Sequence, residues 1–186
     1  SRYDLTDETG RVLVKDKPLL SLKDYNLKQR LEALAGAGIA SFKIEGRLKN
    51  ASYVKNIVRE YSLALDALIE AHPDLYRRAS AGKVSGGFTP APEKTFNRGY
   101  TELFLDERRG PWASPEAATS MGEAVGRAVR VAGDGSSFSV RPVREGLRLG
   151  NGDGLCFVNG RNEVVGFRAD VCDGFHVRCK PVAGLA

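Results

Sequence analysis

The sequence predicts an α+β chain whose two halves are built differently. From Pro18 to His72, the apolar residues follow the order strand, helix, strand, helix, and capping or turn residues stand at each boundary. From Met121 onward, short β-branched runs alternate with turn signals such as Asn159-Gly160. Since 42% of the 186 residues are hydrophobic and 27% are charged, the chain has an ordinary globular composition and enough length to bury a core.

The first predicted unit is a short strand followed by a helix. Leu19 to Lys23 is an apolar-rich run of strand length, and Asp24 or Asn26 can cap the helix that follows, with capping as the simpler role for Asp24. Gly36 and Gly38 are expected to end this helix. Its apolar face consists of Leu27, Leu31 and Leu34.

The second predicted unit repeats this order. Ile39 to Glu45 is expected to be a strand, and Asn50 or Ser52 can cap a long helix that Pro73 bounds. Short connections between such units imply parallel strands covered by helices, but two strands do not make a stable parallel sheet. We therefore favour the severed β-α-β-α end of a larger barrel-like domain over a segment that borrows strands from the second half.

The second half is expected to be a small β module. A connector rich in Gly, Pro, Ser and Thr precedes it and holds a short strand at Tyr100 to Leu105. The module itself should contain five or six strands in a small barrel or sandwich, with hairpin turns at 133–135 and 159–160. We interpret GNGDG at 150–154 as a tight hairpin, because no helix follows it to form a phosphate site. The predicted division is 1–80 for the strand–helix units, 81–116 for the connector and 117–186 for the β module.

Composition narrows the possible functions. No apolar run approaches the roughly 20 residues that span a bilayer, and the first residues lack the layout of a signal peptide, so we expect no membrane partner and a cytoplasmic location. A net charge of +5 permits an RNA partner without requiring one. The three cysteines have no C-x2-C spacing, and His72 and His176 are the only histidines, so we expect no metal site or catalytic triad in this chain.

Lys43, Glu45 and Arg47 are the candidate catalytic residues. Side chains alternate along a strand, so Lys43 and Glu45 would share one face with Ser41, while Phe42 would point the other way. In a parallel barrel the charged face would point toward the axis, with Arg47 at the carboxyl-end mouth where active sites lie. An edge strand whose polar face meets water, or a structural ion pair, explains the same pattern equally well.

Lys23, Asn97, Arg98 and Tyr100 are the candidate substrate-binding residues. Lys23 ends the first predicted strand and could join the same mouth. The connector motif FNRGY, residues 96–100, combines aromatic rings, an amide, a guanidinium and a flexible backbone, which suits stacking on a base or binding a phosphate. A loop that is pinned by its aromatic rings, with Arg98 in a structural salt bridge, is at least as good an interpretation.

Several segments together resemble one known family. These are SLKD at 21–24, SFKIEGRLKNASYVKNIV at 41–58, TPAPEKTFNRGYT at 89–101, GNGDGL at 150–155 and VVGFRA at 164–169. In this order they resemble the collagenase-like peptidase family U-32, and the similarity runs from about Tyr3 to Ala169. The last two segments are most similar to the long members associated with hydroxylation of a cytidine in large-subunit ribosomal RNA.

The resemblance implies a function for a longer parent protein. It implies that this chain is an internal or C-terminal piece of an RNA-modifying enzyme, inactive alone, whose partners are ribosomal RNA or its precursor and the missing N-terminal part of the same protein. It also implies an iron–sulfur cluster in the parent, held largely by upstream cysteines. Some relatives carry a cysteine soon after the SLKD segment, where this sequence has Tyr25, Asn26 and Leu27, so no cofactor is expected in this piece.

Two alternatives to RNA hydroxylation stay open. One is a collagenase-like peptidase, as the family name implies, although no thiol precedes Cys156 to serve as a nucleophile. The other is a non-catalytic β module that binds RNA or protein, which is compatible with the first function.

Overall fold

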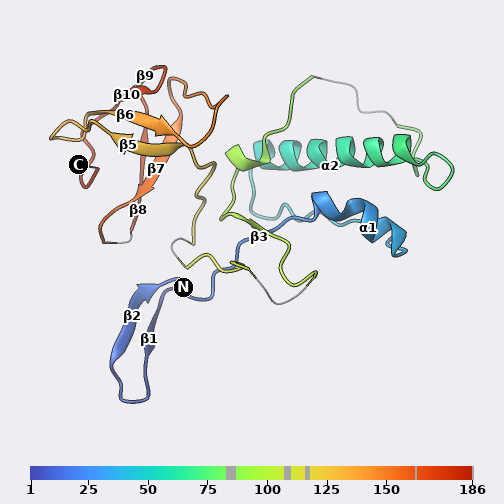
Figure 1. The fold of residues 1–186 in the computed structure, drawn as a ribbon, viewed down its shortest axis with the longest axis horizontal. Coiled ribbons are helices and arrows are strands. Elements are labelled where there is room, and N and C mark those ends of the chain that lie inside the picture. The colour runs from blue at the N-terminus through green and yellow to red at the C-terminus, as the bar shows by residue number, and fades with distance from the viewer. Residues whose placement is uncertain (83–86, 107–109, 116–117, 162, 186) are drawn as a thin grey trace. The chain divides into compact units, whose positions relative to one another are not determined.

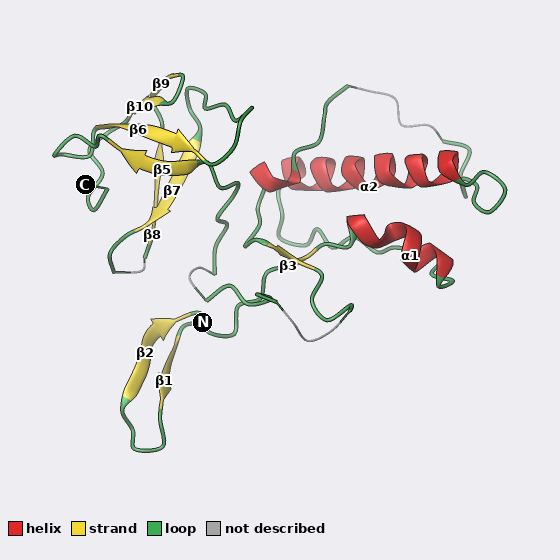
Figure 2. Cartoon of the chain, in the orientation of Figure 1, coloured by secondary structure: helices red, strands yellow, loops and turns green. Residues whose placement is uncertain are grey.

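The computed structural model describes residues 1–82, 87–106, 110–115, 118–161 and 163–185 (Figure 1). The chain separates into two compact units: Leu22–Ala113 forms one, and Ser1–Ser21 with Ser114–Ala186 forms the other. Figure 2 shows that the helices belong to the first of these units, whereas the second is built from strands and loops. The mixture of helices and strands agrees with the predicted α+β class, but the sheets of the described residues do not close into a barrel.

Both predicted helices are confirmed in the unit Leu22–Ala113. A 3-10 turn at Lys28–Arg30 leads into α1, Leu31–Gly36. Past its end, the amide of Ile39 donates to the carbonyl of Leu34 and Gly38 adopts a left-handed φ of 89°, which is the glycine-dependent ending expected from the sequence.

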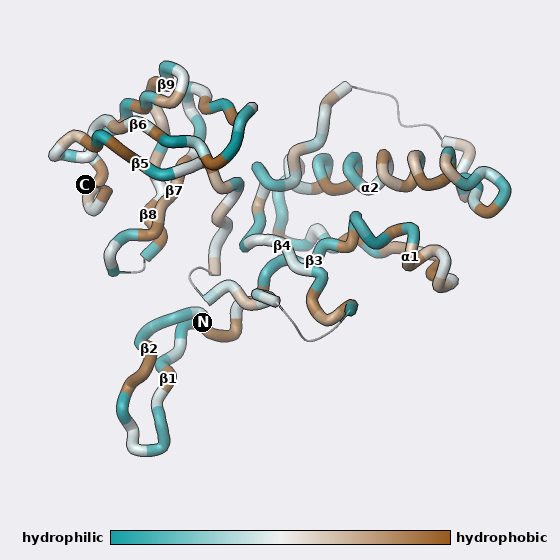
Figure 3. Tube along the Cα trace, viewed as in Figure 1, coloured by the Kyte–Doolittle hydropathy of each residue, from teal (hydrophilic) through white to brown (hydrophobic). Residues whose placement is uncertain are grey.

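The long helix α2 spans Ala51–Ala71. Its cap is Asn50, whose side chain accepts a hydrogen bond from the amide of Tyr53 at 2.9 Å, as the sequence indicated. Hydrophobic and hydrophilic residues alternate along the helix (Figure 3), and Ile57 is its buried residue. No helix in the described part of the chain is both long and apolar enough to span a membrane.

The strands of this unit are shorter than predicted. β3 is Asp24–Tyr25 rather than Leu19–Lys23, and β4 is Tyr100–Thr101 rather than Tyr100–Leu105. The two pair in parallel, with Asp24 opposite Tyr100, so the unit does contain a parallel pair.

The expected strand Ile39–Glu45 does not form. Residues 40–45 make no backbone hydrogen bond to another described residue. An extended segment becomes a strand only when a neighbouring backbone supplies hydrogen bonds, and the described residues supply none to 40–45. The alternation of apolar and charged residues therefore predicted a strand that the structure does not contain at this position.

A hairpin near the N-terminus was absent from the sequence prediction. β1, Tyr3–Thr6, pairs antiparallel with β2, Val12–Lys17, and both strands are largely exposed. The Asp7 carboxylate accepts hydrogen bonds from Thr9 and Arg11 in the connecting turn. The missed signal was the short acidic turn ending in glycine between two β-prone runs.

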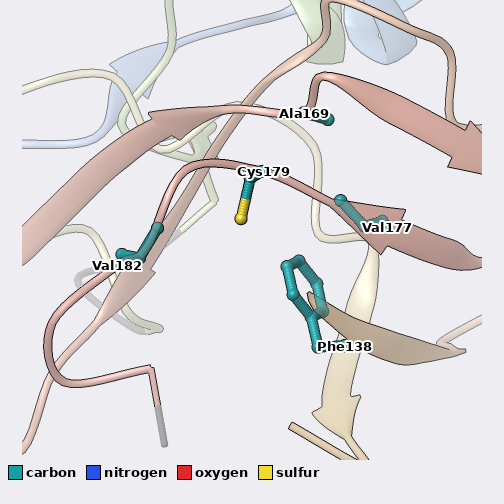
Figure 4. Close-up of a cluster of buried hydrophobic side chains, with 5 residues drawn as sticks. All are labelled: Phe138, Ala169, Val177, Cys179 and Val182. Carbon is teal, nitrogen blue, oxygen red and sulfur yellow. The ribbon is translucent and has the colours of Figure 1, made fainter. Parts of the chain in front are cut away.

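The described residues of the β module form six strands, within the predicted number. Four form one sheet in the order β5-β6-β10-β9, and β7 pairs with β8. Val177 and Ala169 are fully buried in its core beside Phe138, Cys179 and Val182 (Figure 4). The six strands are β5 Gly126–Val129, β6 Ser137–Pro142, β7 Gly154–Val158, β8 Val164–Arg168, β9 Val171–Asp173 and β10 His176–Arg178.

The turns of the module follow the sequence with one exception. Residues 133–135 lie between the paired strands β5 and β6, and 159–160 lie between β7 and β8, as predicted. The GNGDG segment is a turn but not a hairpin, because no strand precedes it. The Asp153 carboxylate accepts from the amide of Gly150 at 2.8 Å, and the Gly152 amide donates to Ala169. The predicted division at 1–80, 81–116 and 117–186 stays a prediction.

Candidate functional site

A cleft of 790 Å³ lies within the unit Leu22–Ala113. One face of α2 lines it, together with β3, β4 and the irregular segment 39–49. The cleft therefore collects most of the residues that the sequence singled out. Those among its lining residues are Lys43, Glu45, Arg47, Arg98 and Tyr100.

An ion pair connects the two strands beside the cleft. The Arg98 guanidinium donates from Nη2 to Asp24 Oδ1 at 3.0 Å and, more weakly, from Nε to Oδ2 at 3.4 Å, and the Arg98 amide donates to Oδ2 at 2.7 Å. The side chains are 18% exposed for Asp24 and 29% for Arg98, so water screens the pair only in part. Asp24 thus anchors Arg98 instead of capping the following helix, and Arg98 has the structural salt bridge that was one of its two interpretations.

Asn26, the other predicted cap, bonds to the start of the following 3-10 turn without being its N-cap, which is Leu27. The Asn26 carboxamide oxygen accepts from the amide of Lys28 at 3.0 Å and from the hydroxyl of Tyr61 at 2.9 Å. The same hydroxyl accepts from the amide of Leu27 at 3.1 Å. Burial raises the pKa of Tyr61, so the phenol stays neutral and can donate to Asn26. Tyr61 therefore ties α2 to the chain that follows β3.

The FNRGY loop is held mainly from inside. Asn97 is 3% exposed, and its amide group donates to the carbonyls of Glu93 and Thr95 while its oxygen accepts from the amide of Gly99. The Tyr100 hydroxyl donates to the carbonyl of Pro92 at 3.1 Å, and burial raises the pKa of this phenol.

Gly99 adopts a φ of 84°, which allows the sharp turn before β4. The alkyl chain of Lys23 lies against Gly99, since a Cβ there would sit 3.5 Å from Lys23 Cδ and Cε. Lys23 thus packs on the loop and does not line the cleft. Asn97 and Tyr100 brace the loop, and only Tyr100 of these two also lines the cleft.

The rim of the cleft carries the candidate catalytic residues. Lys43 Nζ lies 2.8 Å from Glu45 Oε1, and these side chains are 85% and 69% exposed. The hydrogen bond to Glu45, followed by its charge, raises the pKa of Lys43. Arg47 is exposed in the turn that follows. The pair therefore meets water in this structure, and the catalytic role of Lys43, Glu45 and Arg47 stays a prediction.

Gly46 fixes where this rim meets the helix. A Cβ at Gly46 would lie 3.2 Å from a methyl group of Val54, so a side chain there would require a shift of a few tenths of an ångström. The turn is closed by a hydrogen bond from the amide of Lys49 to the Gly46 carbonyl at 3.0 Å. Close packing against Val54 thus explains why a glycine stands between Glu45 and Arg47.

Four further cleft residues, Lys49, Tyr25, Tyr53 and Tyr61, were not singled out as site candidates by the sequence. Lys49 Nζ lies 3.2 Å from the centre of the Phe96 ring and 5.7 Å from that of Tyr53, so the cation is held between aromatic faces. Tyr25 is 59% exposed on β3. Tyr53 and Tyr61 could have been found from their spacing, because with Ile57 they recur every four residues on one helix face. The Lys49–Phe96 contact joins distant segments and leaves no sequence signal.

The cleft can bind an anion and stack an aromatic group, but its described lining offers Ser41 no histidine that could activate it as a nucleophile. Its exposed cations are Lys43 and Arg47, and its lining residues include neither cysteine nor histidine. A serine–histidine or cysteine–histidine pair therefore cannot be assembled from the residues that line it.

The cysteines do not suit ligation of an iron–sulfur cluster. Each thiol donates to a different backbone carbonyl: Cys156 to Met121, Cys172 to Gly150 and Cys179 to Gly135. Burial raises the pKa of all three thiols, so in this structure they are neutral hydrogen-bond donors. In the described ranges, no three His, Cys, Asp or Glu residues gather as a metal site.

Comparison with known proteins decides the family. The profile of peptidase family U32 matches residues 1–113, which includes the whole cleft. The chain belongs to peptidase family U32. This agrees with the resemblance carried by the SFKIEGR and EKTFNRGYT segments.

The relatives in this family are longer than the chain. It is 45% identical over 171 residues to the 23S rRNA 5-hydroxycytidine C2501 synthase of Escherichia coli, which covers 92% of this chain and 25% of that protein. It is 27% identical over 111 residues to a collagenase of Porphyromonas gingivalis, which covers 59% of this chain and 29% of that protein. The chain thus spans about a quarter of the length of these relatives. No solved structure matches it.

Proposed function

We propose that this chain is part of an enzyme that forms 5-hydroxycytidine in 23S ribosomal RNA, and that its cleft contributes to binding the target nucleotide. The observation that carries the proposal is the 45% identity over 92% of the chain to the Escherichia coli synthase. The identity includes both the U32 part and most of the β module, whereas the collagenase match covers 59% of the chain.

The exposed groups of the cleft suit a cytidine nucleotide. Tyr25 presents an aromatic ring on which an unstacked base can lie. The Glu45 carboxylate is an acceptor for the exocyclic amino group of cytosine, and Arg47 is a donor for a phosphate. In this proposal Glu45 selects the base, while Arg47 holds the backbone.

The inner groups of the cleft hold this arrangement in place. The Asp24–Arg98 pair and the Tyr61 hydroxyl are already engaged with protein partners, so they position β3 and α2 and do not contact the RNA directly. Lys49, fixed between Phe96 and Tyr53, adds positive charge beside the rim.

Hydroxylation of cytosine is an oxidation and requires redox chemistry that the cleft residues do not supply. We propose that the iron–sulfur cluster implied by the family is bound by other parts of a longer protein, because the three cysteines here do not fit as its ligands. No step is assigned to this chain beyond binding and orienting the nucleotide.

The test uses the longer parent protein in Escherichia coli cells that lack the 23S rRNA 5-hydroxycytidine synthase. Wild type, Arg47→Ala, Glu45→Gln and the control Lys55→Ala are produced at equal folded levels, and 5-hydroxycytidine in 23S rRNA is measured by mass spectrometry. Lys55 is exposed on α2 and does not line the cleft. We expect wild type and the control to restore the modification and both cleft variants to lose most of it.

Two results would overturn parts of this proposal. Full modification by Arg47→Ala and Glu45→Gln would show that the cleft does not bind the nucleotide. A wild-type parent that leaves the RNA unmodified but cleaves denatured collagen would favour the peptidase alternative.

A further inference from the structure

One face of the four-stranded sheet in the β module carries unpaired positive charge. The residues that alternate with the core residues Ala128, Phe138, Val140 and Val177 point away from the core. We call this outward surface the basic sheet face and define it by Arg127 on β5, Arg141 on β6, and His176 and Arg178 on β10. All four residues are exposed.

The closest like charges on this face lie directly opposite each other. Arg127 pairs with Arg141 across the antiparallel strands β5 and β6. Gly126 permits this register, because a Cβ there would lie 2.2 Å from the Arg141 carbonyl oxygen. Like charges in this position repel and weaken a sheet, so the pair does not serve the stability of the fold.

No carboxylate within the described residues neutralises the arginines. Arg127, Arg141 and Arg178 form no salt bridge with a described residue. Asp173, opposite His176 on the edge strand β9, is the single acidic residue among the outward positions of these strands. The face therefore retains a positive excess that an external anion can satisfy.

The arrangement of the arginines suits a chain of anions. Arg127 and Arg141 can converge on one phosphate, since opposite Cβ atoms lie roughly 5 Å apart. Arg178 lies opposite Ser137, four residues from Arg141, and thus roughly 13 Å further along the sheet. Ser139 and His176, hydrogen-bonded at 3.3 Å, supply polar groups between these two positions.

We propose that the basic sheet face binds the phosphate backbone of RNA and docks the enzyme on its substrate. This inference rests on the proposed function, because RNA is the polyanion which that function would present. It concerns a surface of the β module and residues other than those of the cleft, so it can fail independently.

The test is RNA binding by the whole 186-residue chain. The probe is a fluorescein-labelled single-stranded 23S rRNA segment that contains the target cytidine. Its fluorescence anisotropy is measured between about 50 and 200 mM salt, the range over which phosphate contacts weaken. The variant Arg127→Gln/Arg141→Gln is compared with Arg148→Gln/Arg161→Gln. The control pair is exposed in the same module, lies outside the four-stranded sheet and removes the same charge.

We expect the sheet variant to bind RNA at least about tenfold more weakly at low salt, because it loses two charge-assisted contacts. The slope of log K against log salt should fall by about 1.4, which is roughly 0.7 for each lost phosphate contact. The control should keep the wild-type slope. Circular dichroism spectra that match wild type would exclude misfolding as the cause.

Each contrary result overturns the inference. Equal loss in both variants would mean that only total charge matters. Wild-type affinity in the sheet variant would exclude this face as the docking surface. The absence of RNA binding by the wild-type chain at about 50 mM salt would exclude it as well. The proposed function would still be tested separately, by the modification of ribosomal RNA by the parent protein. Complete displacement of the RNA by an equal charge of polyglutamate would indicate an acidic protein partner instead.

Discussion

Replacing Asp24 should destabilise the unit Leu22–Ala113 far more than replacing any exposed charge of the cleft. Asp24→Ala removes the acceptor for the Arg98 amide and for its guanidinium, with contacts of 2.7, 3.0 and 3.4 Å, and leaves a cation that is 29% exposed without its partner. Hydrogen bonds to charged groups contribute about 1.5–3 kcal/mol, and breaking a buried pair costs about 3–5 kcal/mol. Because this pair is partly exposed, we expect about 3 kcal/mol.

The measurement is urea unfolding followed by the fluorescence of Trp112. This residue is the single tryptophan, lies in the same unit, and packs edge-to-face on Phe104 with ring centres 5.7 Å apart. A loss of about 3 kcal/mol should lower the urea midpoint by roughly 1–2 M. A double-mutant cycle with Arg98→Ala should give a coupling free energy of about 2 kcal/mol.

The matched control is the exposed pair on the rim. Lys43→Ala/Glu45→Ala removes an ion pair whose side chains are 85% and 69% exposed, so the midpoint should not change measurably. The reasoning would be refuted by a loss below about 1 kcal/mol for Asp24→Ala, or by a coupling free energy near zero, since either result would mean that solvent replaces the carboxylate at little cost.

Four further predictions concern single side chains. Tyr61→Phe removes a hydroxyl with two partners and should cost about 1–2 kcal/mol in the same urea assay. Asn50→Ala removes the cap of α2 and should cost about 1 kcal/mol, measured by helical circular dichroism. Gly126→Ala would place a Cβ 2.2 Å from a carbonyl oxygen and should destabilise the β module by about 2 kcal/mol or more, seen as faster hydrogen exchange in its strands. Burial raises the pKa of Tyr100, so the unfolded phenol ionises first and stability should fall as the pH rises above about 10; Tyr100→Phe should lessen that fall.

Each of these has a result that would contradict it. An unchanged midpoint in Tyr61→Phe would mean that water satisfies the Leu27 amide. Unchanged helix stability in Asn50→Ala would imply a different cap, and wild-type exchange rates in Gly126→Ala would show that β5 can shift freely. For Tyr100, an equal decline of stability above pH 10 in wild type and variant would assign the effect to other tyrosines.

The helices were predictable because their signals are local. Each signal acts within one or two helical turns. The signals are the cap at Asn50, an apolar face that repeats about every four residues, and the glycines at positions 36 and 38. The same holds for the hairpin turns of the β module, where 133–135 and 159–160 determine how adjacent strands connect. The family resemblance was also readable, since it depends on the order of residues alone.

The strands and the site depended on contacts between distant residues. The segment Ile39–Glu45 has the alternation of a strand, but residues 40–45 bond to no other described backbone, so the segment is irregular and its charges are exposed. The partner of Asp24 lies 74 residues away, and this separation turned an expected helix cap into half of an ion pair.

The sequence by itself thus determined the family, the two helices and the strand-rich character of the last part of the chain. Only the tertiary structure decided that Arg98 is engaged, that Lys49 lies between Phe96 and Tyr53, and that Arg127 faces Arg141. Local propensity acts over a few neighbouring residues, whereas ion pairs, cation–π contacts and strand register arise between segments that meet only after the chain has folded.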